Sequence, residues 1–173
     1  GAVFFAMGIG PSILYYLKKK KLTKDEAITI SIFYSLVVIL ILSFLFFFFK
    51  NTFLESFNNI ISEQMLLFVF LLIITNIIIT FFGYIIMDNK LGVKIWSIIG
   101  ILVNIVYIIL LFILVYDFSK GVMGAIYALF FSVLVKLLFC IKYVFTEKVF
   151  FKIVSIKIAK KICKYGLGIF IGN

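Results

Sequence analysis

Four long apolar runs constrain the fold of this chain more than any other feature. The runs hold 21 to 24 residues, each is bounded on both sides by charged residues, and they cover positions 27–49, 64–87, 95–116 and 121–141. At about 1.5 Å of rise per residue, a helix of roughly 20 residues crosses the roughly 30 Å hydrocarbon core of a bilayer. Each run therefore predicts a transmembrane helix.

A fifth apolar run occupies positions 2–17. No basic stretch precedes it, and Lys18 to Lys21 follow it, which is the order of a spanning helix rather than of a signal peptide. We expect it to be a truncated span, because the chain begins at Gly1. Another apolar stretch covers positions 165–173, and we expect it to be the truncated start of a further transmembrane helix.

The composition agrees with helices in a bilayer. Apolar residues make up 65% of the chain, aromatic residues make up 19%, and the mean hydropathy is +1.30, whereas soluble domains are only about half apolar. A transmembrane barrel would need strands that alternate apolar and polar residues, and the runs show no such alternation. The sequence therefore predicts an all-α polytopic membrane protein.

Lysine accounts for all 17 basic residues, and its distribution gives the orientation. Fourteen lysines lie on one side of the predicted spans, in segments 18–26, 88–94 and 142–164. Only Lys50 and Lys120 lie on the other side. Short loops rich in lysine stay in the cytoplasm, so we expect the first span to run from outside to inside and the others to alternate.

The side chains that carry most enzyme chemistry are missing or scattered. The chain has no histidine, its seven carboxylates lie outside the middles of the spans, and the separation of Cys140 and Cys163 matches neither a disulfide framework nor a metal site. We therefore expect no catalytic residue, no metal and no cofactor. The net charge of +10 comes from lysines beside the spans, so membrane lipid is the expected partner and nucleic acid is not.

The connection at positions 142–164 is predicted to be a cytoplasmic linker with an amphipathic helix at about 155–164. On a helical wheel its apolar and basic residues separate into two faces. The apolar face holds Ile156, Ile158, Ala159, Ile162 and Cys163, and the basic face holds Lys157, Lys160, Lys161 and Lys164. Such a helix lies on the membrane surface or covers the ends of the spans. We expect a break near Ser155, because Lys148 and Lys152 fall on a different face.

Three residues of the first run can bend or pack a helix. Gly8, Gly10 and Pro11 stand close together. Proline removes a backbone donor, and glycine permits either close helix packing or a local bend. A bend would act as the hinge of a gate, whereas the alternative is a static kink absorbed by packing.

Polar and aromatic residues in the spans have separate expected roles. Asn76 and Asn104 lie near the middles of their spans and need hydrogen-bond partners that lipid does not supply, so we expect them to face protein or water. Near the cytoplasmic ends of the spans lie Tyr15, Tyr16, Tyr84 and Trp96. They are expected to be interfacial anchors.

Four short segments resemble a family of bacterial exporters, in the same order along the chain. The segment from Gly8 to Leu17, followed by four lysines, resembles the second helix of the O-antigen flippases in the multidrug/oligosaccharidyl-lipid/polysaccharide exporter superfamily. Residues 88–92 resemble their turn between helices four and five, residues 121–125 the start of helix six, and residues 164–167 the approach to helix seven. The chain is thus similar to most of the first six-helix lobe of a MATE-like fold, without helix one.

The resemblance implies a multi-pass transport protein of the bacterial cytoplasmic membrane, not an enzyme. Family members are thought to move a polyprenyl-pyrophosphate-linked oligosaccharide across that membrane by alternating access, for the synthesis of surface polysaccharide. The lipid-linked oligosaccharide is then the expected substrate. Two alternatives remain open: a multidrug or other small-molecule exporter of the same superfamily, and a membrane-embedded polysaccharide polymerase or sugar transferase, against which the short outer turns argue.

Lys136, Ser132, Asn76 and Asn104 are the candidate substrate-binding residues. Lys136 and Ser132 lie on the same helix face, in a stripe of small and polar residues. Because such a face packs against other helices, we expect Lys136 to point into the protein. A charge at the centre of a span costs about 2.5 to 3.5 kcal/mol and suggests a transport pathway. The alternative is that Lys136 snorkels to the cytoplasmic interface, because Ile141 at the end of its run is only about 7.5 Å away along the helix axis.

Overall fold

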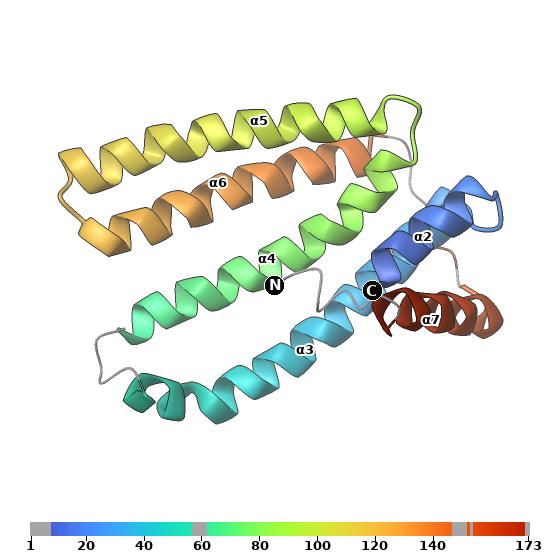
Figure 1. Cartoon of the computed structure of the whole chain (residues 1–173), viewed down its shortest axis with the longest axis horizontal. Coiled ribbons are helices and arrows are strands. Elements are labelled where there is room, and N and C mark those ends of the chain that lie inside the picture. Colours follow the sequence, from blue (N-terminus) through green and yellow to red (C-terminus); the bar gives the residue numbers. More distant parts are fainter. Residues whose placement is uncertain (1–7, 57–61, 147–151, 153, 172–173) are drawn as a thin grey trace.

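The computed structural model describes residues 8–56, 62–146, 152 and 154–171. Within these ranges every regular element is a helix, and no strand is present (Figure 1). The helices are α2 (Ile9–Lys18), α3 (Lys24–Ser56), α4 (Glu63–Met87), α5 (Gly92–Leu111) with the π-helical turn η1 (Phe112–Asp117), α6 (Gly121–Val144) and α7 (Ile156–Ile171).

Four of the described helices are long and apolar enough to cross a membrane. α3 has 33 residues, α4 has 25, the span Gly92–Tyr116 through α5 and η1 has 25, and α6 has 24. These helices alternate in direction, so their turns lie at two ends of the bundle (Figure 1). We call the end with the α2–α3 and α4–α5 turns the lysine-rich end, and the end with the α5–α6 turn the opposite end. The chain is an all-α polytopic membrane protein, as its sequence predicts.

A capping box fixes the start of α3. The backbone N–H and the hydroxyl of Thr23 donate to a carboxylate oxygen of Glu26 at 2.8 and 2.9 Å, and the Glu26 N–H donates to the Thr23 hydroxyl at 3.3 Å. α3 starts before the apolar run 27–49 and ends after it, at Ser56. The helix is longer than the run because helical hydrogen bonds continue where the helix leaves the hydrocarbon, and charged residues are tolerated there.

α5 ends in a wider turn that meets α6 directly. The N–H of Phe118 donates to the Ile113 carbonyl, five residues back, at 3.1 Å. The chain then reverses through Ser119 and Gly121, whose φ angles are 50° and 54°. A Cβ at Gly124 would lie 2.8 Å from a backbone carbonyl oxygen of η1. This glycine therefore lets the first turns of α6 pack closely against η1.

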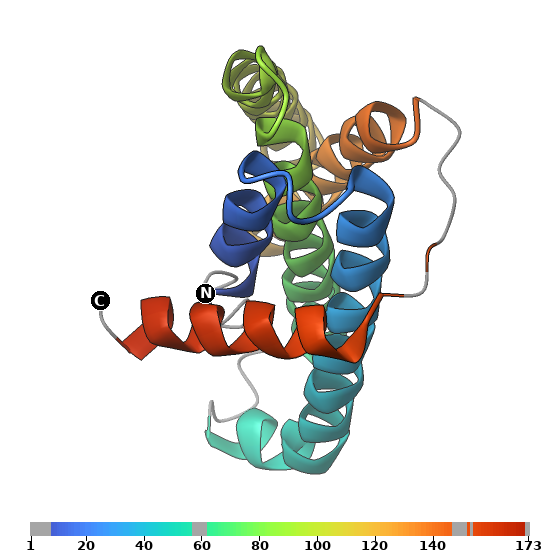
Figure 2. The same ribbon diagram turned by 90° about the vertical axis from the view of Figure 1, so that its right-hand side faces the viewer.

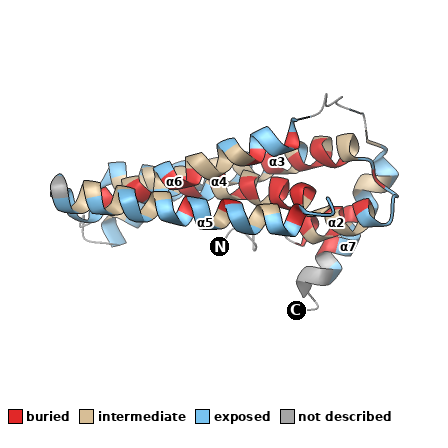
Figure 3. Ribbon diagram, turned by 90° about the horizontal axis from the view of Figure 1, so that it is seen from above, coloured by how far each residue is buried: buried red, intermediate tan, exposed pale blue. Residues whose placement is uncertain are grey.

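α4 lies at the centre of the bundle, in contact with α2, α3, α5 and α6. Ile77 and Phe81 on α4 are 0% and 1% exposed. The buried residues gather in the half of the bundle nearer the lysine-rich end (Figure 3). On α3 they are Ala27, Ile28, Ile30, Ser31 and Ser35. The packed core therefore lies beside the lysine-rich turns.

The two helices at the ends of the described chain also differ from their predicted ranges. The described part of the run 2–17 is α2, which has only 10 residues, and positions 1–7 lie outside the described residues. α7 begins at Ile156, beside the break predicted near Ser155, and continues as one helix of 16 residues. The predicted amphipathic segment and the apolar stretch from position 165 are joined in this helix, because no proline separates them.

Candidate functional site

α7 crosses the bundle and packs against α2 (Figure 2). All four lysines of its predicted basic face are exposed. Ile162 is fully buried and Ile158 packs against the core, whereas Ile156, predicted for the same apolar face, is 73% exposed. The apolar side of α7 is thus covered by the other helices around Ile158 and Ile162, but not at Ile156. A contact between its lysines and membrane lipid stays a prediction.

Glycine permits the close crossing of α2 and α7. Gly8 is the N-cap of α2 and has a φ of 67°. A Cβ at Gly8 would lie 2.2 Å from the carbonyl oxygen of Gly166 on α7. Only glycine therefore fits at this position, both for its backbone angle and for the space available.

Gly10 and Pro11 serve the start and packing of α2. A Cβ at Gly10 would lie 2.2 Å from the ring of Tyr84, which packs against α2 from α4. Pro11 is the third residue of α2, where a backbone N–H has no acceptor within the helix in any case. The Ser12 hydroxyl donates to the Gly8 carbonyl at 2.9 Å. These contacts account for the residues through packing, and a hinge at this position stays a prediction.

Three tyrosines from the two crossing helices form one cluster. Tyr165 of α7 stacks on Tyr15 with 4.6 Å between ring centroids, and it forms a T-shaped pair with Tyr16 at 6.1 Å. The ammonium of Lys19 lies 4.5 Å from the centroid of the Tyr15 ring. A side-chain hydrogen bond with Tyr15 raises the pKa of Lys19. The cluster therefore joins aromatic rings and positive charge at the lysine-rich end.

A cavity of about 460 Å³ opens beside this cluster. We call it the tyrosine–lysine cavity, and its lining residues are Tyr16, Lys161, Lys164, Tyr165 and Gly168. The sequence does not predict this site. Its patterns predict interfacial anchors at Tyr15 and Tyr16 and a membrane-facing surface for the lysines, and only the family-like segment 164–167 includes Tyr165.

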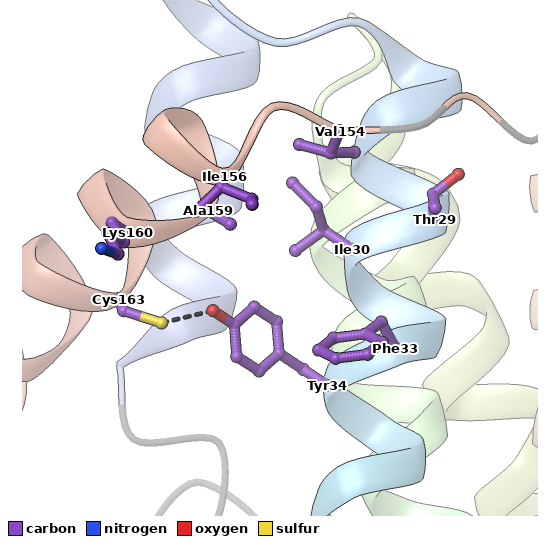
Figure 4. Close-up of a pocket in the computed structure, with 9 residues that line it drawn as sticks. All are labelled: Thr29, Ile30, Phe33, Tyr34, Val154, Ile156, Ala159, Lys160 and Cys163. Carbon is purple, nitrogen blue, oxygen red and sulfur yellow. Dashed lines mark hydrogen bonds between the residues drawn. The ribbon is translucent and has the colours of Figure 1, made fainter.

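A second cavity of about 490 Å³ lies between α3 and α7 (Figure 4). Its lining residues are Thr29, Ile30, Phe33, Tyr34, Val154, Ile156, Ala159, Lys160 and Cys163. A hydrogen bond between the Tyr34 hydroxyl and the Cys163 thiol joins the two helices beside it. Apart from Lys160 and Thr29, the lining offers few polar groups, so this groove suits an apolar chain better than a headgroup.

Lys136 contacts an aromatic ring in the structure. Its ammonium lies 4.5 Å from the centroid of the Trp96 ring. Trp96 is near the start of α5 at the lysine-rich end, and its other neighbour is Gly83 of α4, where a Cβ would lie 2.7 Å from the ring. Lys136 is half-buried and lines none of the cavities described here. A contact between Lys136 and a substrate therefore stays a prediction.

The other three candidate substrate-binding residues also lie away from these cavities. Asn76 donates to the Leu72 carbonyl at 2.9 Å, and Ser132, which is 1% exposed, donates to the Leu129 carbonyl at 2.8 Å. Both use the backbone of their own helix. Asn104 of α5 is exposed within the described part of the chain, and whether it faces water or other protein stays a prediction. The described cavities therefore do not bring these candidates together.

The chain matches no known protein family model, no curated protein and no solved structure.

Proposed function

We propose that this chain is most of the first lobe of a flippase for a polyprenyl-pyrophosphate-linked oligosaccharide in the bacterial cytoplasmic membrane. The observation that carries the proposal is the meeting of two family-like segments. Residues 8–17 and 164–167 are far apart in the sequence, yet Gly8 lies against Gly166 and Tyr15 stacks on Tyr165. Residues that resemble the family in sequence are thus neighbours in space.

In the two remaining family-like segments, residues 88–92 and 121–125, the structure also requires a glycine. A Cβ at Gly92 would lie 2.0 Å from the Ile86 carbonyl oxygen in the α4–α5 turn, and Gly124 allows the close approach of α6 to η1. At these positions the backbone leaves no room for a side chain. This arrangement supports the view that the short motifs mark helix contacts of the proposed fold rather than membrane composition alone.

In this proposal, α7 couples the described lobe to a second one. Alternating access requires two lobes whose contact can change between two arrangements. α7 follows the connection after α6, holds α2 through a glycine crossing and holds α3 through the Tyr34–Cys163 hydrogen bond. Movement of α7 relative to α2 and α3 would then open or close the lysine-rich end.

A deletion strain tests the proposed function. Loss of the gene is expected to abolish surface polysaccharide and to leave the lipid-linked repeat unit in the inner leaflet, and the full-length gene is expected to restore export. The Gly8→Val variant should fail to restore it, because the α2–α7 crossing cannot form, whereas Gly100→Ala should succeed because no atom lies within 4 Å of a Cβ there. Unchanged polysaccharide together with increased drug sensitivity in the deletion strain would identify a drug exporter instead.

Cysteine labelling tests the orientation that the proposal requires. In a variant without Cys140 and Cys163, single cysteines at Thr23 and Asn89 should be protected from an impermeant maleimide in intact cells, and a cysteine at Ser119 should react. Thr23 and Asn89 lie in turns at the lysine-rich end, and Ser119 lies in the turn at the opposite end. Labelling of Thr23 from outside would reverse the orientation.

A further inference from the structure

We propose that the tyrosine–lysine cavity binds the pyrophosphate headgroup of a polyprenyl lipid through Lys161 and Lys164. This inference rests on the proposed function, since it identifies where the cargo first contacts the lobe. The cavity combines a small number of polar groups with aromatic walls, as sites for amphiphilic ligands commonly do.

The positive charge of the cavity is available for a ligand. Lys161 and Lys164 are three residues apart on α7, so they lie on neighbouring turns of one face, and both are exposed. Among the described residues, the carboxylates that form ion pairs do so with Lys50 and Lys152 and not with these two lysines. Two ammonium groups without a carboxylate partner attract a doubly charged ligand, and lysine binds phosphate as a point charge.

The tyrosines give the cavity a defined wall. Tyr165 stacks on Tyr15 and forms a T-shaped pair with Tyr16, and Tyr16 and Tyr165 both line the cavity. Tyr165 is 38% exposed, so part of its side chain is accessible to a ligand. A tyrosine hydroxyl can donate a hydrogen bond to a phosphate oxygen, while the ring offers an apolar surface to the first prenyl unit.

The location of the cavity fits a membrane headgroup. Tyr15 and Tyr16 lie in the last turns of α2, directly before the turn that contains Lys18 to Lys21. With the orientation predicted from the lysines, this end of α2 lies at the inner interface, where the headgroups of inner-leaflet lipids are found. Lys19 adds a third positive charge beside the same tyrosines.

The α3–α7 groove on the other side of α7 provides an internal comparison. It is lined mainly by apolar side chains and has one lysine, Lys160, among its lining residues. Lys157 and Lys160 belong to the same basic face as Lys161 and Lys164, but neither lines the tyrosine–lysine cavity. A double substitution of Lys157 and Lys160 therefore removes the same charge from the same helix without touching the proposed site.

Calorimetric titration with farnesyl pyrophosphate tests the site. The full-length protein is used in phosphatidylcholine nanodiscs, and inorganic pyrophosphate and farnesol serve as comparison ligands. Loss of one charge-assisted contact lowers affinity about tenfold, so Lys161→Gln with Lys164→Gln should weaken farnesyl pyrophosphate binding by about 100-fold. The control, Lys157→Gln with Lys160→Gln, should change it by about threefold or less, because neither side chain lines the cavity and exposed charges interact only weakly through water.

Conservative variants separate binding from folding. Lys161→Arg with Lys164→Arg should keep the affinity within about threefold, since both charges remain. Tyr165→Leu should weaken binding more than Tyr165→Phe, because only the phenylalanine keeps the stacked ring. If the two glutamine double variants lose similar affinity for farnesyl pyrophosphate, the ligand is attracted by the general positive charge of α7, and the proposed site is wrong.

The choice of ligand is also open to refutation. Inorganic pyrophosphate that binds as tightly as farnesyl pyrophosphate would show a site for the free anion, and full competition by phosphatidylglycerol added to the nanodiscs would show a site for bulk anionic lipid. Either result contradicts the proposal. If the deletion strain loses export but the protein does not bind farnesyl pyrophosphate, the binding site is wrong and the proposed function stands. If the protein binds farnesyl pyrophosphate but deletion leaves export unchanged, the proposed function is wrong and the binding site stands.

Discussion

The two halves of the bundle are packed in different ways. Toward the lysine-rich end, α2, α3 and α4 bury residues completely, and Ile13, Ile28 and Ile77 are each 0% exposed. Toward the opposite end, the second half of α3 has no buried residue among those described, and all of its phenylalanines except Phe46 are exposed. Phe47, for example, is 75% exposed. One helix thus belongs to a dense core at one end and to an open surface at the other.

A cavity of about 430 Å³ separates α3 and α4 in the open half. Phe46 of α3 stacks on Phe70 of α4 at 4.3 Å beside it, but the neighbouring side chains leave space. Lipid chains are as apolar as these side chains, so the hydrophobic effect does not press the two helices together there. Close packing in a bilayer depends instead on small residues, and neither α3 nor α4 has a glycine in this half, whereas Gly8, Gly10 and Gly83 lie in the dense half.

The largest expected effect comes from truncating a phenylalanine in the dense half. Phe81→Ala should lower the free energy of unfolding by about 3 kcal/mol, near the low end of the cost in soluble cores, because lipid takes the place of water as the unfolded surroundings. Phe47→Ala, on the open half, should change it by about 0.5 kcal/mol or less. Unfolding in mixed micelles with increasing dodecyl sulfate measures both. Equal losses would show that the open half is packed in the native protein.

Glycine substitutions should show the same difference between tightly packed and open positions, with smaller changes in the free energy of unfolding. Gly92→Ala should destabilise the protein by about 2 kcal/mol, since its Cβ would meet the Ile86 carbonyl oxygen at 2.0 Å and the α4–α5 turn would have to move. Gly100→Ala, on the same helix but with no atom within 4 Å, should stabilise it by up to about 1 kcal/mol through helix propensity. The same unfolding measurement applies, and destabilisation by Gly100→Ala would indicate a contact outside the described residues.

The positions of the spanning helices could be predicted from the sequence because each run must by itself be long and apolar enough to cross the bilayer. Length and apolarity decide whether a segment spans, and the charged residues at its ends mark where it leaves the hydrocarbon. The dense half could not be assigned in this way. Whether Asn104 faces outward depends on the rotation of α5 about its axis, and that rotation is set by packing against other helices.

The candidate site was harder to predict for the same reason. Tyr15 and Tyr165 are 150 residues apart, and nothing near either one indicates the other. The contact of Lys136 with Trp96 likewise depends on the alignment of α5 and α6. The wheel of α7 did predict the outward direction of its four lysines, because amphipathicity is a property of one helix alone.

Two buried serines should respond in opposite directions, by about 1 kcal/mol each. The Ser31 hydroxyl is buried and has no hydrogen-bond partner among the described residues, so Ser31→Ala should stabilise the protein. The Ser12 hydroxyl donates to the Gly8 carbonyl, so Ser12→Ala should destabilise it. Loss of stability in Ser31→Ala would reveal a partner for this hydroxyl in the native protein and would make the dense half more polar than described.

The smallest expected effect belongs to the ion pair that links α3 and α4 in the open half. Lys50 pairs with Glu63, and the Glu63 side chain is 64% exposed. An exposed pair contributes about 0.5 kcal/mol and is weakened by salt, so Glu63→Gln should lower stability slightly at low salt and not measurably at 1 M salt. Glu55→Gln is the matched control, because Glu55 is exposed at the same end of α3 and forms no ion pair within the described residues. If Glu63→Gln lowers the free energy of unfolding by more than about 2 kcal/mol and this loss persists in high salt, the ion pair is buried away from water. The open half would then be packed around the pair.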